Sequence, residues 1–250
     1  MISIQRRIIN AGSPVPDFFG IPTNAAKLHP VTFIDIHTHR AVSEPGTMAI
    51  RNMRSDFSRI PAQGCYSVGL HPWYLEVDQA EHLPVELLRA AGLRNVVAIG
   101  ECGLDTRCDT PADLQRAVFI RQIELAQAVQ KPLIIHCVRA FEEILTILRK
   151  RKVSVPVIFH GFRRSETLAR KIIDDGHLLS FGVHLLMASV AEVFRKLPPD
   201  RVFLETDDAE ISIAGIYAAA ARIRGTDIED IAAMIDLNVK HIFGPFTDLI

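Results

Sequence analysis

Short apolar runs recur along the chain from position 31 onward, and each is about as long as one buried strand. Seven of them occupy residues 33–37, 65–70, 96–100, 132–136, 156–160, 178–181 and 202–204. Continuous apolar runs of this length are typical of strands buried on both faces, as in a parallel sheet. Residues 48–53 form an eighth and weaker candidate, because the short segment before them leaves little room for a helix.

Longer amphipathic segments separate several of these runs. Helix start signals at Thr110, Ser165 and Asp227 predict three helices, the first ending near Gln130 and the second at Gly176. Two further segments carry apolar residues at i, i+3, i+4 and i+7, which predicts a helix with one buried stripe in each. The two stripes are Phe141, Ile144, Leu145 and Leu148, and Val190, Val193, Phe194 and Leu197.

The alternation of strands and helices, without hairpin signals, predicts a parallel sheet with helical crossovers. A doubly wound sheet usually carries a glycine-rich phosphate loop after its first strand, and this sequence has none. Polar side chains instead follow the carboxyl ends of several strands, where TIM-type barrels place their sites. We therefore expect an α/β protein with a TIM-type (β/α) barrel at residues 31–250. Residues 1–30 lack periodicity and are expected to be an N-terminal extension.

The composition is that of an ordinary globular protein, and it excludes some classes of binding partner. The 250 residues include 28 basic and 29 acidic side chains, and the resulting charge of -1 excludes nucleic-acid binding through a broad basic surface. No apolar run reaches the ~18 residues of a membrane span, and none follows Arg6 and Arg7 as in a signal peptide. The four cysteines are not spaced as metal-binding pairs. We expect a cytoplasmic protein with free thiols, no membrane contact and no evident protein partner.

Histidines and carboxylates gather at the ends of the predicted strands. His37 and His39 lie two residues apart, so on a strand they project to the same side and can grip one ion. Other strands end in Glu101, His136, His160 and Asp207. Burying so many polar groups in one crevice is costly without a compensating cation. Carboxylates mixed with imidazoles suit Zn, Mn or Mg.

Six motifs, in their order, resemble the TatD family of metal-dependent deoxyribonucleases in the amidohydrolase superfamily. They are DIHTH at 35–39, VGLHP at 68–72, IGECGLD at 99–105, PLIIHC at 132–137, FHGF at 159–162 and LETD at 204–207. The resemblance covers about residues 33–245, and it implies a distorted TIM-type barrel with two divalent metal ions. Because the chain is shorter than the family pattern between His39 and Gly69, we expect the second strand and first helix to be reduced.

The resemblance also implies roles for individual residues. One ion would be held by His37, His39, Glu101 and Asp207, and a second by His136, His160 and the bridging Glu101. Asp207 would orient or deprotonate the attacking water, so Asp207 and Glu101 are the expected catalytic residues. The implied reaction is hydrolysis of a phosphodiester, with DNA as the expected substrate. Two alternatives stay open, a hydrolase of another ester or amide in the same superfamily and a non-catalytic binding protein on the same fold.

Four residues near the strand ends are candidates for binding the substrate. His71 and Trp73 follow a strand at the barrel mouth, where an imidazole can contact phosphate and an indole can stack on a base. Arg163 and Arg164 come just before a helix, and such a pair can clamp phosphate oxygens. The alternatives are a loop anchored by Trp73 and a solvated pair of arginines.

Further residues beside the predicted ligands have supporting roles. Glu205 shares a strand face with Asp207, so we expect it to orient a histidine ligand. Cys102 and Cys137 each follow a predicted ligand, and strand alternation turns them away from the ions as buried thiols. After Asp207 the chain departs from the family pattern with Asp208-Ala-Glu210, which adds two acids near the site.

Overall fold

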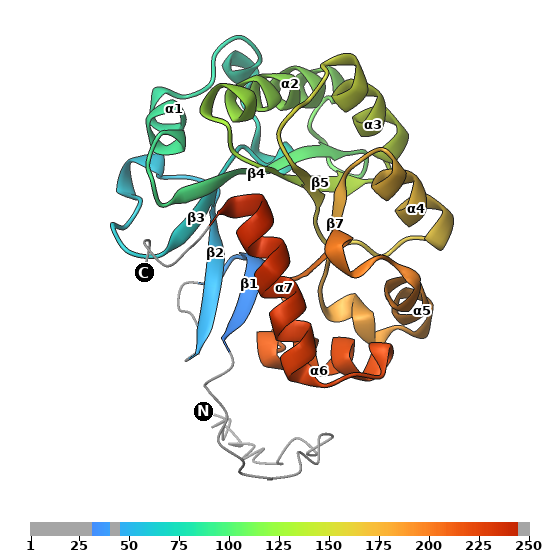
Figure 1. The fold of residues 1–250 in the computed structure, drawn as a ribbon. Helices are drawn as coiled ribbons and strands as arrows, with labels where there is room; N and C mark the ends of the chain where they lie inside the picture. Colours follow the sequence, from blue (N-terminus) through green and yellow to red (C-terminus); the bar gives the residue numbers. More distant parts are fainter. Residues whose placement is uncertain (1–31, 41–45, 245–250) are drawn as a thin grey trace, which may run out of the picture. The chain divides into compact units, whose positions relative to one another are not determined.

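The computed structural model describes residues 32–40 and 46–244, and the expected extension at 1–30 lies outside them. In the described ranges, eight parallel strands form one sheet in the order of the chain (Figure 1). The strands are β1 (Phe33–Thr38), β2 (Thr47–Met53), β3 (Cys65–Val68), β4 (Val96–Asp105), β5 (Leu133–Val138), β6 (Val157–Phe159), β7 (Leu178–Phe181) and β8 (Val202–Leu204). All seven strands predicted from apolar runs are confirmed, and so is the weaker candidate at 48–53.

The barrel is nearly closed where its first and last strands meet. Asp207, just after β8, pairs with the end of β1: its amide donates to the His37 carbonyl (2.9 Å), and its carbonyl accepts from the His39 amide (3.3 Å). The sheet therefore curls into the expected TIM-type barrel.

Helices cover the outside and one end of the barrel (Figure 1). They are α1 (Val85–Ala91), α2 (Ala112–Val129), α3 (Phe141–Lys150), α4 (Glu166–Asp174), α5 (Ala188–Lys196), α6 (Ile213–Arg224) and α7 (Ile228–Phe243). The helix across the end is α7, where Phe243 approaches the starts of β4 and β5. The apolar stripes of α3 and α5 are buried as predicted, and Ser165 and Asp227 stand at the N-caps of α4 and α7. No helix of the described ranges combines the length and the apolar content that crossing a bilayer requires.

The expected reduction near the start of the barrel lies in the connections, not in the second strand. β2 has seven residues and pairs in parallel with both β1 and β3. Only residues 39–46 connect β1 to β2, and the connection from β2 to β3 contains one short 3-10 turn, Phe57–Arg59. On this side of the barrel, the described residues therefore place little helix against the sheet, while the sheet itself is continuous.

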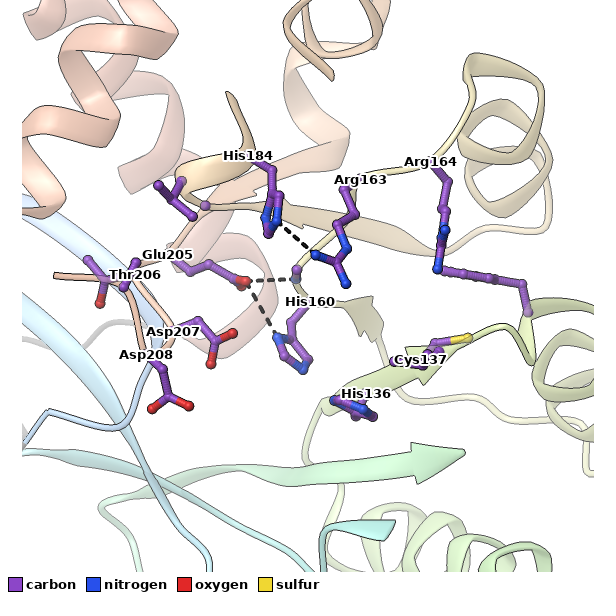
Figure 2. Close-up of a pocket in the computed structure, with 16 residues that line it drawn as sticks. His136, Cys137, His160, Arg163, Arg164, His184, Glu205, Thr206, Asp207 and Asp208 are labelled. Atoms are coloured by element: carbon purple, nitrogen blue, oxygen red, sulfur yellow. Dashed lines mark hydrogen bonds and ion pairs between the residues drawn. The ribbon is translucent and has the colours of Figure 1, made fainter. Parts of the chain in front are cut away.

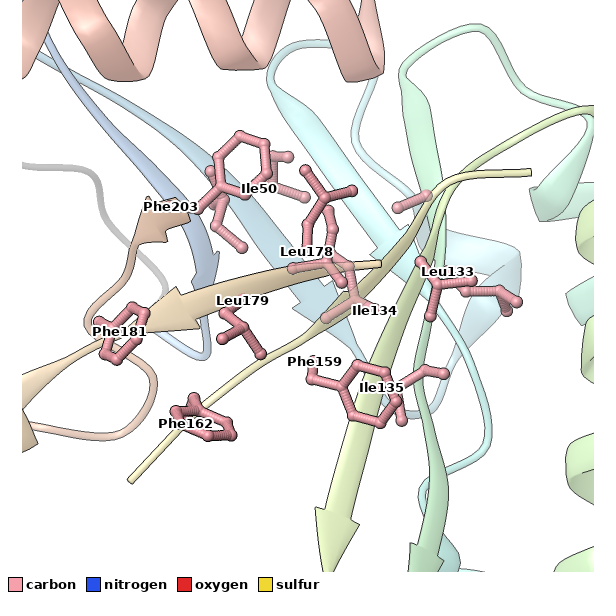
Figure 3. Close-up of a cluster of buried hydrophobic side chains, with 14 of the residues drawn as sticks. Ile50, Leu133, Ile134, Ile135, Phe159, Phe162, Leu178, Leu179, Phe181 and Phe203 are labelled. Carbon is pink, nitrogen blue, oxygen red and sulfur yellow. The ribbon is translucent and has the colours of Figure 1, made fainter. Parts of the chain in front are cut away.

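The core is built from the apolar strand residues that the sequence pattern selects. Strands β5 to β8 and the loop after β6 contribute a dense cluster of fully buried side chains (Figure 3), among them Leu133, Ile134, Ile135, Phe159, Phe162, Leu179, Phe181 and Phe203. Packing on both faces holds each strand in place. The strand ends are thereby fixed, and these ends carry the polar side chains.

Candidate metal centre

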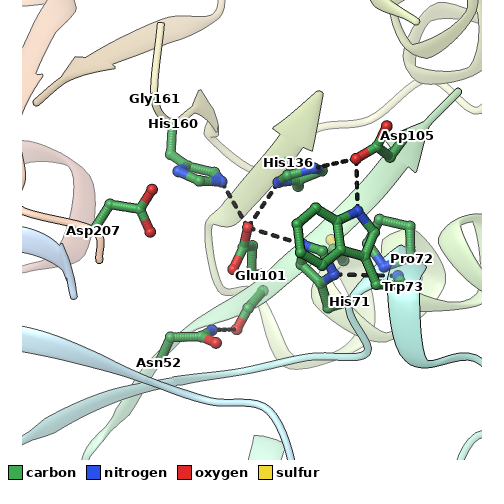
Figure 4. A network of polar contacts seen from close by, with 12 residues as sticks. Asn52, His71, Pro72, Trp73, Glu101, Asp105, His136, His160, Gly161 and Asp207 are labelled. Atoms are coloured by element: carbon green, nitrogen blue, oxygen red, sulfur yellow. Dashed lines mark hydrogen bonds and ion pairs between the residues drawn. The ribbon is translucent and has the colours of Figure 1, made fainter. Parts of the chain in front are cut away.

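Six side chains predicted as metal ligands converge at the carboxyl end of the barrel. His37 and His39 come from the end of β1, Glu101 from the middle of β4, and the others from β5 and the segments that follow β6 and β8. Figure 4 shows Glu101 between His136 and His160, with Asp207 facing them across the site. The His37 side chain is fully buried and Glu101 is 4% exposed, so a carboxylate is enclosed here among imidazoles.

One oxygen of Glu101 faces the two histidines of β1. Glu101 Oε2 lies 3.6 Å from His37 Nε2 and 3.2 Å from His39 Nε2. Asp207 Oδ1 lies 3.7 Å and 3.5 Å from the same two nitrogens. Two ligands of one tetrahedral ion with bonds of ~2.1 Å are themselves about 3.4 Å apart. These four side chains therefore have the spacing of ligands around a shared cation.

The other oxygen of Glu101 faces a second group of imidazoles. Glu101 Oε1 lies 2.8 Å from His136 Nδ1, 2.8 Å from His160 Nε2 and 3.2 Å from His71 Nε2. His71, predicted as a substrate contact, is thus placed directly beside the predicted ligands. His71, Glu101 and His136 form one group with the spacing of a metal site, and His37, Glu101 and His160 form another.

The residues present fit a divalent cation. Both ring nitrogens of His37 are buried without a hydrogen-bond partner. A buried unpartnered nitrogen costs free energy unless something satisfies it. Burial raises the pKa of Glu101, but the charge of His160 and the histidine hydrogen bonds outweigh it and hold this pKa well below its usual value. The site therefore favours an ionised carboxylate whose two oxygens face the two groups of histidines.

Two carboxylates support the ligand histidines from behind. Glu205, fully buried, has Oε1 3.4 Å from His160 Nδ1 and accepts from the Gly161 amide at 2.7 Å, which is the placement expected of a residue that orients His160. Asp105 Oδ2 lies 3.2 Å from His136 Nε2 and accepts a 2.6 Å hydrogen bond from Trp73 Nε1. The sequence analysis did not single out Asp105, although its place at the end of the IGECGLD motif was a usable signal.

The backbone of β4 needs glycine to bring Glu101 into this position. Gly103 has φ +146°, and a Cβ there would lie 2.0 Å from the His136 carbonyl oxygen. Gly100 has φ +142°, and its Cβ would lie 2.3 Å from the Ile134 carbonyl. Only glycine tolerates such conformations and such close approach. The register between β4 and β5 shifts between Ile99 and Cys102, around Glu101.

Asp35 and Asn52 hold the strand ends, and the sequence analysis missed both. The Asp35 carboxylate accepts from the Thr206 amide (3.0 Å) and hydroxyl (2.6 Å), beside Asp207. Burial raises the pKa of Asp35 to about 7. Asn52 donates to the Gly100 carbonyl at 2.7 Å (Figure 4). Asp35 opens the DIHTH motif at 35–39, whereas Asn52 had no sequence signal. The role of each is recognised only by the partners that the fold brings to it.

A cleft of about 320 Å³ opens beside the histidines (Figure 2). His136, His160 and Asp207 line it together with Arg163, Arg164 and His184. Arg163 Nη1 donates to His184 Nε2 at 2.9 Å. Both predicted arginines are thus placed beside the candidate centre, and the exposed Asp208 lies across from them. Cys137 also lines this cleft, whereas Cys102 is fully buried.

On the other side of the centre, Trp73 and Tyr74 form an aromatic rim. They are 52% and 58% exposed, and the Trp73 ring lies 5.1 Å from the His71 ring between centroids. The Arg54 guanidinium lies over the Tyr74 ring. The rim therefore offers exposed aromatic faces next to the buried polar cluster.

Comparison with known proteins gives consistent matches. The family model described as TatD related DNase matches residues 46–244. The uncharacterized metal-dependent hydrolase YabD of Bacillus subtilis is 31% identical over 195 residues, 71% of this chain and 76% of that protein. The 3'-5' ssDNA/RNA exonuclease TatD of Erwinia amylovora is 29% identical over 226 residues, 80% of this chain and 86% of that protein. The crystal structure of the TatD homologue YJJV from Escherichia coli superposes with a TM-score of 0.72 at 22% identity, covering 87% of this chain and all of that one, which shows the shared fold.

Proposed function

Since the chain belongs to the TatD family of metal-dependent hydrolases, we propose that it is a deoxyribonuclease that cleaves phosphodiester bonds with two divalent ions. Among its relatives, the Erwinia protein is named as an exonuclease of single-stranded DNA and RNA. A human relative, 33% identical over 150 residues, is named as an RNA nuclease. Both names support a nucleic-acid substrate.

The arrangement around Glu101 supports a centre of two ions. Its Oε2 faces His37 and His39, and its Oε1 faces His136 and His160. A carboxylate with each oxygen in a separate nitrogen cluster is suited to bridging two cations. Imidazole and carboxylate donors fit Zn, Mn or Mg.

Asp207 is suited to handling the proton of the attacking water. Its carboxylate is 40% exposed and lines the cleft, while Glu101 is enclosed. Divalent ions bound here would polarise the phosphodiester and lower the pKa of the attacking water. Asp207 holds that water by a hydrogen bond and accepts its proton. Glu205 and Asp105 keep His160 and His136 turned toward Glu101.

The test is metal analysis of the purified protein followed by an assay on single-stranded DNA with Mg, Mn and Zn. We expect about two equivalents of metal and cleavage that a chelator abolishes. Glu101→Ala should lose metal and activity together, because one side chain serves both clusters. A metal-loaded protein that cleaves carboxylic esters or amides but no phosphodiester would favour the alternative hydrolase. A protein that binds DNA without turning over any substrate would favour the binding protein. The cytoplasmic location and the lack of a protein partner stay predictions.

A further inference from the structure

The two arginines of the cleft lie beside the candidate centre. In the described part of the chain, neither Arg163 nor Arg164 has a carboxylate within ion-pair distance, and neither is among the residues with unprinted contacts. Some other arginines are paired with carboxylates, as Arg149 is with Asp175 and Arg151 with Glu124, and others donate to backbone carbonyls, as Arg121 and Arg224 do. Two guanidinium groups without a counter-charge, in one cleft beside a candidate metal centre, favour an anionic ligand.

One of these guanidinium groups is hydrogen-bonded to a histidine of the same cleft. Arg163 donates to His184 Nε2, so His184 acts as an acceptor and is neutral in this contact. The pKa of His184 is lowered, first by burial and then by the charge of Arg163. A neutral histidine leaves the guanidinium charge uncancelled, and the other N–H groups of Arg163 remain available to a ligand.

The basic and the acidic side chains of the cleft lie on opposite walls. Figure 2 shows Arg163, Arg164 and His184 on one wall, Asp207 and Asp208 on the opposite one, and His160 between them. A strand of nucleic acid with its scissile phosphate at the histidines would be repelled by Asp208 and attracted by the arginines. The arginine wall therefore gives the substrate a preferred direction.

We infer that Arg163 and Arg164 form a subsite for a second phosphate, next to the one that is cleaved. The planar fork of arginine binds phosphate oxygens through two parallel hydrogen bonds. A cleft of about 320 Å³ is at the small end of ligand sites, which suits one nucleotide unit. The natural substrate accordingly carries at least two phosphates, as an oligonucleotide or a phosphate-terminated fragment does. This inference rests on the proposed function.

The experiment compares three substrates with the same scissile bond, using the metal-loaded protein. They are the thymidine dinucleotides TpT, pTpT and TpTp, which carry no terminal phosphate, a 5′-phosphate and a 3′-phosphate. We expect one phosphorylated compound to have a kcat/KM at least about tenfold above that of TpT. Which of the two is preferred shows the direction of the bound strand.

Variants assign that preference to the arginines. In Arg163→Ala/Arg164→Ala the ratio of the preferred compound to TpT should fall to within about twofold of one. Arg163→Lys/Arg164→Lys keeps the charge but loses the planar fork of hydrogen-bond donors. The ratio of the preferred compound to TpT in this variant should lie between those of the native protein and the double alanine variant. The matched control is Arg149→Ala/Arg151→Ala at the end of α3, which removes two paired surface charges at the opposite end of the barrel. Its ratio should equal that of the native protein.

The outcomes separate the subsite from the proposed function. Equal kcat/KM for all three compounds, or a preference that survives in the double alanine variant, overturns the subsite while the phosphodiesterase stands. If none of the three is hydrolysed, the phosphodiesterase assignment fails only where single-stranded DNA is not hydrolysed either. Calorimetric titration with thymidine 3′,5′-bisphosphate and thymidine 5′-monophosphate then decides the subsite alone. Arginine-dependent tighter binding of the bisphosphate supports the subsite, and equal binding overturns it.

Discussion

At the scale of single residues, Asp207 serves both the backbone and the candidate centre. Its amide and carbonyl close the barrel onto β1, while its carboxylate faces His37 and His39. Its φ of +52° lies in the left-handed region, which few residues other than glycine adopt, aspartate and asparagine more often than most. Strain of this kind persists where the surrounding structure determines it, and it is common at functional sites.

Asparagine at this position separates the two roles of Asp207. Asp207→Asn keeps the shape and one oxygen, but its amide cannot accept a proton at neutral pH. We expect kcat on single-stranded DNA to fall by about 10²–10⁴, with the metal in the His136 cluster retained. A kcat within tenfold of native would make Asp207 structural, and His71, beside Glu101, would be the next candidate for the base, because Glu205 is buried behind His160.

Asp105 can be tested by a signal that does not depend on turnover. Trp73 is the only tryptophan of the chain, and its indole N–H binds the same carboxylate oxygen that faces His136. Asp105→Ala should weaken metal binding about 10–100-fold, measured by titration of Trp73 fluorescence and by calorimetry. Trp73→Phe removes one hydrogen bond but leaves His136 its partner, so its calorimetric affinity should change less. Native metal affinity in Asp105→Ala would contradict the role.

The sequence predicts the side chains that meet at the site better than those that hold them there. His37, His39, His136 and Asp207 stand at or near strand ends, and parallel strands bring their ends to one face. Glu101 was expected at a strand end too, but β4 continues past it to Asp105. Supporting residues such as Asp105 and Asp35 are defined by contacts between distant segments. Asp35 binds Thr206, 171 positions away, and no local pattern contains that relation.

At the scale of elements, apolar runs and start signals predicted every strand and five of the seven helices that the structure describes. The sequence analysis named neither α1 nor α6. In α6 the buried residues include Ile213, Ile216, Tyr217 and three alanines, so small residues blur the stripe that defines an amphipathic helix. Tyr217 also shows what such a helix contributes, because its hydroxyl binds both the amide and the carbonyl of Ile34 on β1.

The contact between β4 and β5 can be tested at one glycine. Gly103→Ala would place a methyl group against the His136 carbonyl, which must separate the two strands that carry Glu101 and His136. We expect a loss of about 2 kcal/mol or more in the free energy of unfolding, measured with urea, together with weaker metal binding. The matched control is Gly92→Ala after α1, where φ is −80° and the nearest atom is 3.4 Å away. If Gly103→Ala matched this control in both measurements, the close approach would not be required.

At the scale of the whole molecule, metal should stabilise the fold. A ligand that binds only the folded protein at 100 times its dissociation constant adds about 2.7 kcal/mol to the free energy of unfolding. We expect the metal-loaded protein to unfold at higher urea concentration than the protein treated with a chelator. Glu101→Ala should show no such difference. Equal midpoints for the loaded and stripped native protein would show that metal and folding are not coupled.

The seam between β1 and Asp207 has a consequence for how the protein is made. His37 and His39 are synthesised early, whereas Asp207, whose carboxylate and backbone complete their surroundings, is synthesised about 170 positions later. Contacts of such long sequence separation form late, because much chain must be ordered first. A nascent chain that stops before Asp207 lacks the backbone contacts that close the barrel onto β1, and it lacks the Asp207 carboxylate that faces the two histidines. Under the proposed function, a chain would gain hydrolytic activity only after Asp207 has been synthesised and has reached the end of β1.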